Sequence, residues 1–413
     1  MRNRPQHVVV VGAGMVGLST AWFLQREGVQ VTVLDREGVA AGSSWGNAGW
    51  LAPALTLPLP EPSILTAGVR AALKPASPVY VPLTLDPRLL RFLVGFARHC
   101  TPARWGRAMS VFSLANREAL DAFADLHDVA EPTRPADPFL TAFASEPDRD
   151  VLLGEFAQVA EHGGTVDAEL LTGDEVRALE PALADGVTCG VLLRGQRFVN
   201  PGRFVHALAD AVRRRGGDIV VGAAVEDVVD RGWGVEVQVA GDEPMAADAA
   251  VIANGTWIGS LAWRHGVRAV VQAGRGYSFT VQPEQMPRNP VYFPTQRVAC
   301  TPLGDGFRVA GMMEFRRADA PLDPRRIHAI VDAVAPMLRG VDWEARTDEW
   351  VGSRPCTADG LPIVGRTRSP RVHVAGGHGM WGMALGPLTG RLLAAQIVRD
   401  ETPALLRHLN PLR

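Results

Sequence analysis

A glycine-rich turn near the start of the chain limits the possible fold more than any other feature. Before it, the residues Val8 to Val11 form a short apolar run of the kind that a fully buried parallel strand requires. The spacing G-x-G-x-x-G follows at once at Gly12, Gly14 and Gly17. A helical stretch over 18–27 comes next. This order of strand, glycine-rich turn and helix predicts the first half of a βαβ unit.

Each of these glycines allows a contact that a larger residue would block. Gly12 permits a tight turn, Gly14 lets the backbone approach a pyrophosphate, and Gly17 allows close packing of helix on strand. The N-terminus of the helix offers unpaired N–H groups to phosphates. A second strand over 29–34 ends in Asp35, where a carboxylate can bind a ribose hydroxyl pair. The unit therefore predicts dinucleotide binding, and the alternative is a glycine-rich turn in an ordinary βαβ unit.

The size and charge of the chain are those of an ordinary globular protein. With 413 residues it is too long for one compact core, so we expect two domains. A hydrophobic fraction of 47% and a formal charge of −2 give no sign of a nucleic-acid partner. The one lysine, Lys74, lies in no recognisable motif, which argues against Schiff-base and P-loop chemistry.

Cysteine spacing and hydropathy indicate the compartment. The four cysteines are far apart and include no C-x-x-C pair, so we expect reduced thiols, no metal site and a cytoplasmic protein. No run of about eighteen apolar residues predicts a transmembrane helix. A basic amphipathic helix over 86–100 could lie on the inner face of the cell membrane as a peripheral contact, or pack on its own domain.

The pattern of elements changes along the chain. Prolines crowd the stretch 51–80, so we expect the chain to leave the first domain there. Short strands between 218 and 252 predict a return to the nucleotide-binding sheet. Alternation over 267–315 then predicts an antiparallel sheet, and a helix should cover 324–338.

A second glycine-rich strand–loop–helix unit lies near the end of the sequence. A strand over 371–375 runs into the segment G-G-H-G-M-W-G-M at 376–383. Pro387 is expected in the first turn of a helix that reaches about residue 398. The N-terminus of that helix could stabilise a second negative group, such as the reduced pyrimidine edge of a flavin. A unit that binds NAD alone would not need it.

Six segments spread over nearly the full length carry a resemblance to a known family. They are V-V-G-A-G-M-V-G-L-S-T-A (10–21), S-S-x-x-N-A-G (43–49), G-R-G-Y-S (274–278), R-V-A-G-M-M-E-F (308–315), W-V-G-S-R-P-x-T-x-D-G-L-P-I-V-G (350–365) and G-H-G-M-W-G-M-A-L-G-P (377–387). In order and spacing they resemble the FAD-dependent D-amino-acid oxidase superfamily, and within it the small-subunit type of bacterial D-amino-acid dehydrogenase. The resemblance implies an α/β (α+β) two-domain flavoprotein with a Rossmann-like FAD-binding domain and an antiparallel-sheet substrate domain.

The implied FAD-binding domain is assembled from separated stretches of chain. Breaks in composition near Leu51, Val199, Trp263 and Trp350 agree with such a division. We expect the FAD-binding domain to comprise residues 1–52, 199–263 and 351–413, and the substrate-binding domain to comprise residues 53–198 and 264–350.

The resemblance implies FAD as the cofactor, and the matching segments predict which residues hold it. Some relatives attach the flavin through a cysteine, but Cys356 does not fit their spacing, so we expect non-covalent FAD. The expected contacts are Gly12, Ala13, Gly14, Met15, Val16, Gly17, Asp35, Arg36, Ser43, Ser44, Asn47, Ala48, Gly49, Val225, Asn254, Gly255, Trp257, Gly377, His378, Gly379, Met380, Trp381, Gly382 and Met383.

The implied reaction is oxidation of an α-amino acid by hydride transfer from its α-carbon to flavin N5, which gives an imino acid and then a keto acid. Arg354 matches the family arginine that binds the substrate carboxylate, a task suited to a bidentate guanidinium. The alternative for Arg354 is a structural salt bridge. Tyr277 and Tyr292 could each add a hydrogen bond, and Arg275 is a weaker charged candidate. His378 could contact the cofactor or the substrate.

Three functions stay open at this point. The leading one is a dehydrogenase of D-amino acids, including cyclic ones such as D-proline or hydroxyproline, that passes electrons to a quinone or another carrier and could have partner subunits. The second is an oxygen-using oxidase of glycine, sarcosine or another secondary amine. A tyrosine that glycine oxidases use is replaced near Ala299, which disfavours glycine. The third is a non-catalytic FAD-binding electron-transfer subunit.

Overall fold

The glycine-rich turn joins a buried strand to a buried helix. In the computed structural model, which describes residues 4–66, 77–82 and 84–413, β1 (His7–Val11) leads into α1 (Met15–Arg26). β2 (Gln30–Asp35) then returns parallel to β1. Gly28 follows the helix with φ +77°, the left-handed conformation that ends many helices. The predicted βαβ unit is confirmed, while Lys74 and part of the proline-rich stretch lie outside the described residues.

A six-stranded sheet brings the two glycine-rich units together. Its order is β10-β2-β1-β14-β21-β20, and all neighbours are parallel except β20 and β21. β14 therefore lies between β1, which enters the first glycine-rich turn, and β21, which enters the second. The strands not yet described are β10 (Asp218–Val221), β14 (Ala249–Ile252), β20 (Ile363–Arg366) and β21 (Val372–Gly376).

Only part of the stretch 218–252 joins this sheet. β11 (Val225–Asp230) and β12 (Val235–Val239) pair with β13 (Met245–Ala247) in a separate three-stranded antiparallel sheet. The prediction that all these strands return to the nucleotide-binding sheet is therefore wrong for β11 and β12. Every residue of β14 is buried, whereas burial alternates along β12, as expected where only one face of a strand is covered.

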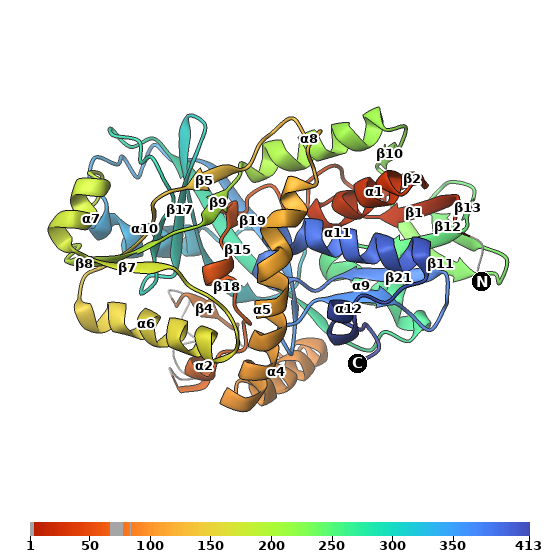
Figure 1. Cartoon of the computed structure of the whole chain (residues 1–413), viewed down its shortest axis with the longest axis horizontal. Coiled ribbons are helices and arrows are strands. Elements are labelled where there is room, and N and C mark those ends of the chain that lie inside the picture. Colours follow the sequence, from red (N-terminus) through yellow and green to blue (C-terminus); the bar gives the residue numbers. More distant parts are fainter. Residues whose placement is uncertain (1–3, 67–76, 83) are drawn as a thin grey trace.

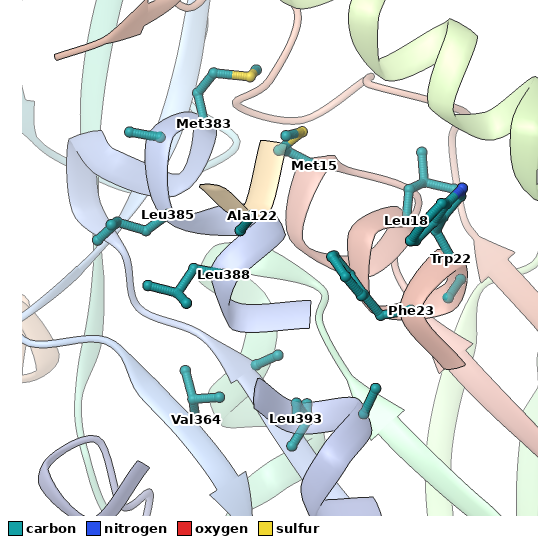
Figure 2. Packing of buried hydrophobic residues seen from close by; sticks show 14 of the residues in the cluster. Met15, Leu18, Trp22, Phe23, Ala122, Val364, Met383, Leu385, Leu388 and Leu393 are labelled. Carbon is teal, nitrogen blue, oxygen red and sulfur yellow. The ribbon is translucent and has the colours of Figure 1, made fainter. Parts of the chain in front are cut away.

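Two long helices cover this sheet and pack on each other. Figure 2 shows Met15, Leu18 and Trp22 of α1 in the same layer as Met383 and Leu388 of α11 (Gly382–Arg399). α5 (Pro102–Ala124) and α8 (Pro201–Arg214) pack at their sides.

The start of α11 differs from the sequence-based expectation. The helix begins at Gly382, so the prediction that Pro387 lies in its first turn is wrong. A proline inside a helix removes one hydrogen bond. The residues around it, including Leu385 and Leu388, are buried in the core with α1, and this packing offsets the loss.

The second large sheet has nine strands and is mostly antiparallel. Its order is β19-β15-β18-β17-β16-β6-β8-β7, with β4 paired to β18. One face packs on α10 (Pro324–Val334), and the predicted antiparallel sheet over 267–315 is confirmed. The strands are β4 (Val79–Tyr80), β6 (Phe139–Phe143), β7 (Ala168–Thr172), β8 (Cys189–Leu193), β15 (Val271–Val281), β16 (Val291–Phe293), β17 (Val298–Leu303), β18 (Gly306–Phe315) and β19 (Thr347–Thr357).

The two sheets occupy opposite halves of the molecule. In Figure 1 the parallel sheet lies at the right with both termini, and the antiparallel sheet lies at the left. The predicted mixed α/β two-domain fold is confirmed, and the domain boundaries stay a prediction. The remaining elements are α2 (Pro62–Thr66), α4 (Pro87–His99), α6 (Glu146–Glu161), α7 (Gly173–Leu179), α9 (Ile258–Ala262), α12 (Ala404–His408), β3 (Trp50–Leu51), β5 (Arg134–Ala136) and β9 (Gln196–Phe198).

The described residues contain neither a membrane-spanning helix nor a cluster of metal-binding side chains. No helix there is long and apolar enough to cross a bilayer. The same ranges contain no group of three or more His, Cys, Asp or Glu side chains that could hold a metal ion. All four cysteines are buried and free.

Candidate active site

A cleft of about 620 Å³ runs between the two halves of the molecule. Its walls come from the first glycine-rich turn, the loop at 41–47, the segment 253–257, the strand β19 and the second glycine-rich loop. Both glycine-rich units therefore face one continuous space. The predicted residues that line it are Gly12, Gly14, Met15, Val16, Asp35, Arg36, Ser43, Ser44, Asn47, Val225, Asn254, Gly255, Trp257, Arg354, His378, Gly379, Met380, Gly382 and Met383.

Six of the residues predicted to hold the cofactor stand behind this lining: Ala13, Gly17, Ala48, Gly49, Gly377 and Trp381. Several of them shape the wall. A Cβ on Gly17 would lie 2.0 Å from the Gly12 carbonyl oxygen, and one on Gly49 would lie 2.1 Å from the Val199 carbonyl oxygen. The Trp381 indole donates to the Leu57 carbonyl oxygen at 2.6 Å.

The first glycine-rich turn is fixed by close backbone contacts. Gly12 has φ +116°, and a Cβ there would lie 2.5 Å from the Ala253 carbonyl oxygen. No residue with a side chain fits both conditions. The turn also binds the adjoining loop, because the Met15 amide donates to Ser44 Oγ at 3.2 Å. These contacts hold the N-terminus of α1 open toward the cleft, which is the arrangement that binds phosphates.

Asp35 ends β2 and lies at the same end of the cleft. Its carboxylate accepts the amide of Ala13 at 2.8 Å and those of Glu37 and Gly38 at 2.9 Å. The neighbouring Arg36 guanidinium lies over the Trp257 ring, 3.8 Å from its centroid. Asp35 therefore orders the glycine-rich turn as well as facing the cleft.

Three buried polar atoms in the wall have no hydrogen-bond partner among the described residues. They are Asn254 Oδ1, Thr256 Oγ1 and His378 Nδ1. Because a buried polar atom without a partner costs free energy, such atoms mark where a ligand binds. They come from two segments of the wall, 254–256 and the second glycine-rich loop, so they fit a ligand with hydrogen-bonding groups along it, as a dinucleotide has. Thr256 was not predicted from the sequence, although it follows Asn254 and Gly255 at the end of β14.

Arg354 is a half-buried cation that lines the cleft. Its guanidinium lies over Gly276, where a Cβ would sit 2.1 Å from Cζ, and Nη1 donates to the Met312 carbonyl oxygen at 2.9 Å. No carboxylate forms an ion pair with it in the parts of the chain that the structure describes. Burial lowers the pKa of the guanidinium. Arg354 is thus not in the alternative role of a structural salt bridge, and it can receive an anionic ligand.

Tyr277 and Arg275 do not line the cleft. The Tyr277 hydroxyl donates to Glu314 Oε2 at 2.6 Å, in the core between the sheet and α10. Arg275 is 1% exposed; its Nη1 lies 3.3 Å from the same carboxylate oxygen, and its Nη2 donates to the Ala320 carbonyl oxygen at 2.5 Å. The structure therefore gives both residues partners inside the protein and does not bring them to a substrate carboxylate.

Tyr292 also lies away from the cleft lining. Its ring meets Trp50 edge to face, with the centroids 5.2 Å apart, and burial raises the pKa of its hydroxyl. Charged groups surround it: Arg297 Nη2 lies 3.6 Å from Glu61 Oε2. Nearby, burial and the Glu61 charge raise the pKa of Glu155 to about 7.

The side chain at the centre of the second glycine-rich loop is neutral. His378 is 2% exposed, and its Nε2 lies 2.8 Å from Thr389 Oγ1 of α11. Burial lowers the pKa of the imidazole to about 4, so His378 carries no charge at pH 7. Cys356 pairs with it through the backbone and lies behind the lining. Burial raises the pKa of the Cys356 thiol to about 12.

Comparisons with known proteins agree over almost the whole chain. The model of the family described as FAD dependent oxidoreductase matches residues 7–396. A D-amino acid dehydrogenase from Cereibacter sphaeroides is 32% identical over 397 residues, which cover 94% of this chain and 90% of that protein.

Two solved structures share the fold. Glycine oxidase from Geobacillus kaustophilus superimposes with a TM-score of 0.73 at 21% identity, over 100% of this chain and 99% of that one. L-alpha-glycerophosphate oxidase from Mycoplasma pneumoniae, with FAD bound, gives a TM-score of 0.73 at 18% identity, over 97% of this chain and 95% of that one.

Proposed function

The chain belongs to the family of FAD-dependent oxidoreductases, and on that premise we propose that it oxidises the α-carbon–nitrogen bond of a D-amino acid. FAD is the cofactor of the family. The name of the relative from Cereibacter sphaeroides supports a D-amino acid as the substrate. The observation that carries the proposal is Arg354, a half-buried guanidinium in the cleft with no carboxylate partner among the described residues.

The two ends of the cleft suit the two ends of FAD. We assign the ADP half to the first glycine-rich turn and Asp35, and the flavin half to the loop around His378. Between them, Asn254 Oδ1 would accept a hydrogen bond from the cofactor, and the Thr256 hydroxyl would donate or accept one. Because Cys356 lies behind the lining as a protonated thiol, we propose that FAD binds without a covalent bond.

Arg354 would bind and orient the amino acid. A bidentate guanidinium–carboxylate pair fixes both position and direction, so the α-carbon faces one side of the cleft. Bound FAD supplies the two-electron acceptor for the α-hydrogen. His378 is neutral at pH 7 and therefore places no second cation beside the substrate ammonium group. The amine must lose its proton before or during binding, because the histidine in the described lining of the cleft, His378, has its pKa lowered to about 4 by burial.

We further propose that the electrons pass to a quinone or another carrier at the inner face of the cell membrane. Helix α4 supports this, because it buries Leu89, Phe92 and Phe96 against the protein and exposes apolar residues on its other side. Leu90 and Val94 are 47% and 53% exposed, and the exposed Arg91 and Arg98 flank them. An apolar strip between arginines fits the surface of an anionic bilayer.

Anaerobic flavin reduction tests the proposed activity. The holoprotein is mixed with a panel of D- and L-amino acids, D-proline, hydroxyproline, glycine and sarcosine, and bleaching of the flavin absorbance is followed. We expect bleaching by D-amino acids. Bleaching by glycine or sarcosine alone, with peroxide formed in air, would favour the oxidase. A flavin that no amine bleaches would contradict the assignment and favour an electron-transfer subunit.

The role of Arg354 has its own test. Arg354→Ala should raise the Michaelis constant for carboxylate substrates at least about tenfold, since a charged hydrogen bond contributes about 1.5–3 kcal/mol. Arg213→Ala is the control, because Arg213 is exposed near the end of α8, pairs with Asp210 and does not line the cleft. An unchanged constant in the Arg354 variant would contradict the role.

The membrane contact is tested by flotation with vesicles that contain anionic lipid. We expect the holoprotein to float with the vesicles. The double variant Leu90→Glu with Val94→Glu should remain in the unbound fraction. Equal flotation of the two proteins would contradict the contact.

A further inference from the structure

A second cavity, of about 510 Å³, lies at the boundary between the two halves and shares no lining residue with the cleft. It is formed by the start of α8, the hairpin of β17 and β18, and the end of β15. Its side chains are mainly polar or charged. This cavity is separate from the FAD site and is not needed for the activity proposed above.

A buried cation forms the floor of this cavity. Arg308 is 8% exposed, and its Nη1 donates to the Trp45 carbonyl oxygen at 2.7 Å. The guanidinium also lies 4.7 Å from the centroid of the Trp45 ring. Its Nε is buried without a hydrogen-bond partner. Among the described residues, no carboxylate lies within ion-pair distance of it. A buried guanidinium in this state is ready to bind a carboxylate.

The rim of the cavity carries charges of both signs. Arg203 of α8 lies on one side, where its amide donates to the Asn200 side chain at 3.1 Å. Asp305 and Asp348 lie on the hairpin side and at the start of β19. The Asp348 charge acts on Arg308 without forming an ion pair. A simple anion would meet repulsion from the two aspartates, whereas a ligand with both charges would satisfy both sets of groups.

We propose that this cavity binds a small zwitterion of the amino-acid class. The carboxylate of the ligand binds Arg308, and its ammonium group faces Asp305 and Asp348. The inference does not rest on the proposed function, because it concerns binding at a separate place.

Occupancy of the cavity would act on the cofactor loop. Arg308 donates a hydrogen bond to the Trp45 carbonyl oxygen. Ser278 Oγ donates to the carbonyl oxygen of the following residue, Gly46, at 2.9 Å. The Trp350 ring packs so closely on Gly46 that a Cβ there would lie 2.1 Å from it. The residues on either side of this pair, Ser44 and Asn47, line the FAD cleft. A ligand that pulls on Arg308 therefore changes the support of the loop that faces the cofactor.

Equilibrium dialysis of the FAD-loaded protein with radiolabelled L-alanine tests the proposal. All measurements use the Arg354→Gln background, so that the carboxylate anchor of the cleft does not contribute. We expect one bound L-alanine per chain. Adding Arg308→Gln should weaken binding at least tenfold. Adding Arg213→Gln, at the exposed far end of α8, should leave it unchanged. No binding in the background protein, or equal binding after Arg308→Gln, would overturn the proposal.

A second pair of variants covers the case in which Arg308→Gln does not fold. Asp305→Asn with Asp348→Asn alters only exposed rim residues and should weaken L-alanine binding at least threefold. The same double variant should bind acetate no more weakly than its parent, because acetate has no ammonium group. Unchanged L-alanine affinity in the double variant would overturn the zwitterion, as would acetate that binds the parent as tightly as L-alanine. Failure of the flavin-bleaching experiment would leave these binding results unaffected.

Discussion

The two glycine-rich units have the same plan but achieve it by different means. β1 and β21 lie on either side of β14, and the helices that follow them begin at the cleft and pack on each other. In the first unit Gly12 and Gly17 are required by backbone contacts, with the Gly17 Cβ position 2.0 Å from the Gly12 carbonyl oxygen. In the second unit, the nearest atom to a Cβ on Gly382 would be 3.6 Å away, and His378 supplies a side chain instead. The strictest backbone contact is at Gly17 in the first unit, whereas the second unit adds the His378 side chain to glycines with positive φ at Gly377 (+73°) and Gly379 (+55°).

The largest expected effect comes from adding one methyl group to each unit. Gly17→Ala should abolish FAD binding and destabilise the protein by more than about 4 kcal/mol, because a Cβ cannot lie 2.0 Å from a carbonyl oxygen. Gly382→Ala, at the first residue of α11, should fold normally and have an unfolding temperature similar to that of the wild-type protein. Flavin absorbance per chain and thermal unfolding measure both variants. Equal damage from the two substitutions would break the comparison.

A smaller effect is expected where the two units meet. A Cβ on Gly390 of α11 would lie 2.6 Å from the Ser19 carbonyl carbon and 2.8 Å from the Thr20 amide nitrogen of α1. Gly390→Ala should therefore lower the free energy of unfolding by about 1–3 kcal/mol, measured by urea titration. The matched control is Gly154→Ala in α6, where no atom lies within 4 Å of the new Cβ. The free energy of unfolding of that variant should rise by about 0.5–1 kcal/mol, because alanine favours a helix more than glycine does. A neutral Gly390→Ala would show that the helices are not held this closely.

The smallest effect depends on pH and belongs to the second unit. Burial lowers the pKa of His378 from 6.5 to about 4, so the folded protein binds fewer protons than the unfolded chain in that window. Stability from this group is complete above about pH 6.5 and is lost as the pH falls toward 4. The difference in free energy of unfolding between His378→Gln and wild type should shift by about 1–3 kcal/mol in favour of the variant when the pH is lowered from 7 to 4.5, as measured in urea titrations. Parallel curves for the two proteins would show that His378 titrates normally.

The sequence predicted the first unit better than the second. Glycine spacing, a buried strand and Asp35 follow from local rules, and all lie where expected. The start of α11 was predicted wrongly because proline is normally found in the first turn of a helix. The place of Pro387 inside α11 is explained by tertiary packing with α1.

Residues whose role depends on the face of a strand were harder to predict. A bulge between Arg275 and Tyr277 interrupts the pairing of β15 with β18, and both side chains point away from the cleft. Arg354 was found by resemblance, but the sequence did not show that Gly276 provides the space for its guanidinium. The lining around Arg308 joins α8, β15, β18 and β19, so no local pattern could predict it.

The strand order of the parallel sheet has a consequence for how the chain folds during its synthesis. β1 and β2 leave the ribosome long before β20, β21 and α11, and α1 packs extensively on α11. Until α11 emerges, the nascent chain has a complete first glycine-rich turn, but the apolar surface of α1 is uncovered. Such a state is prone to aggregation. FAD can reach its full set of contacts only once β21 and α11 have emerged. Supply of the cofactor to newly made chains should therefore govern how many of them become stable protein.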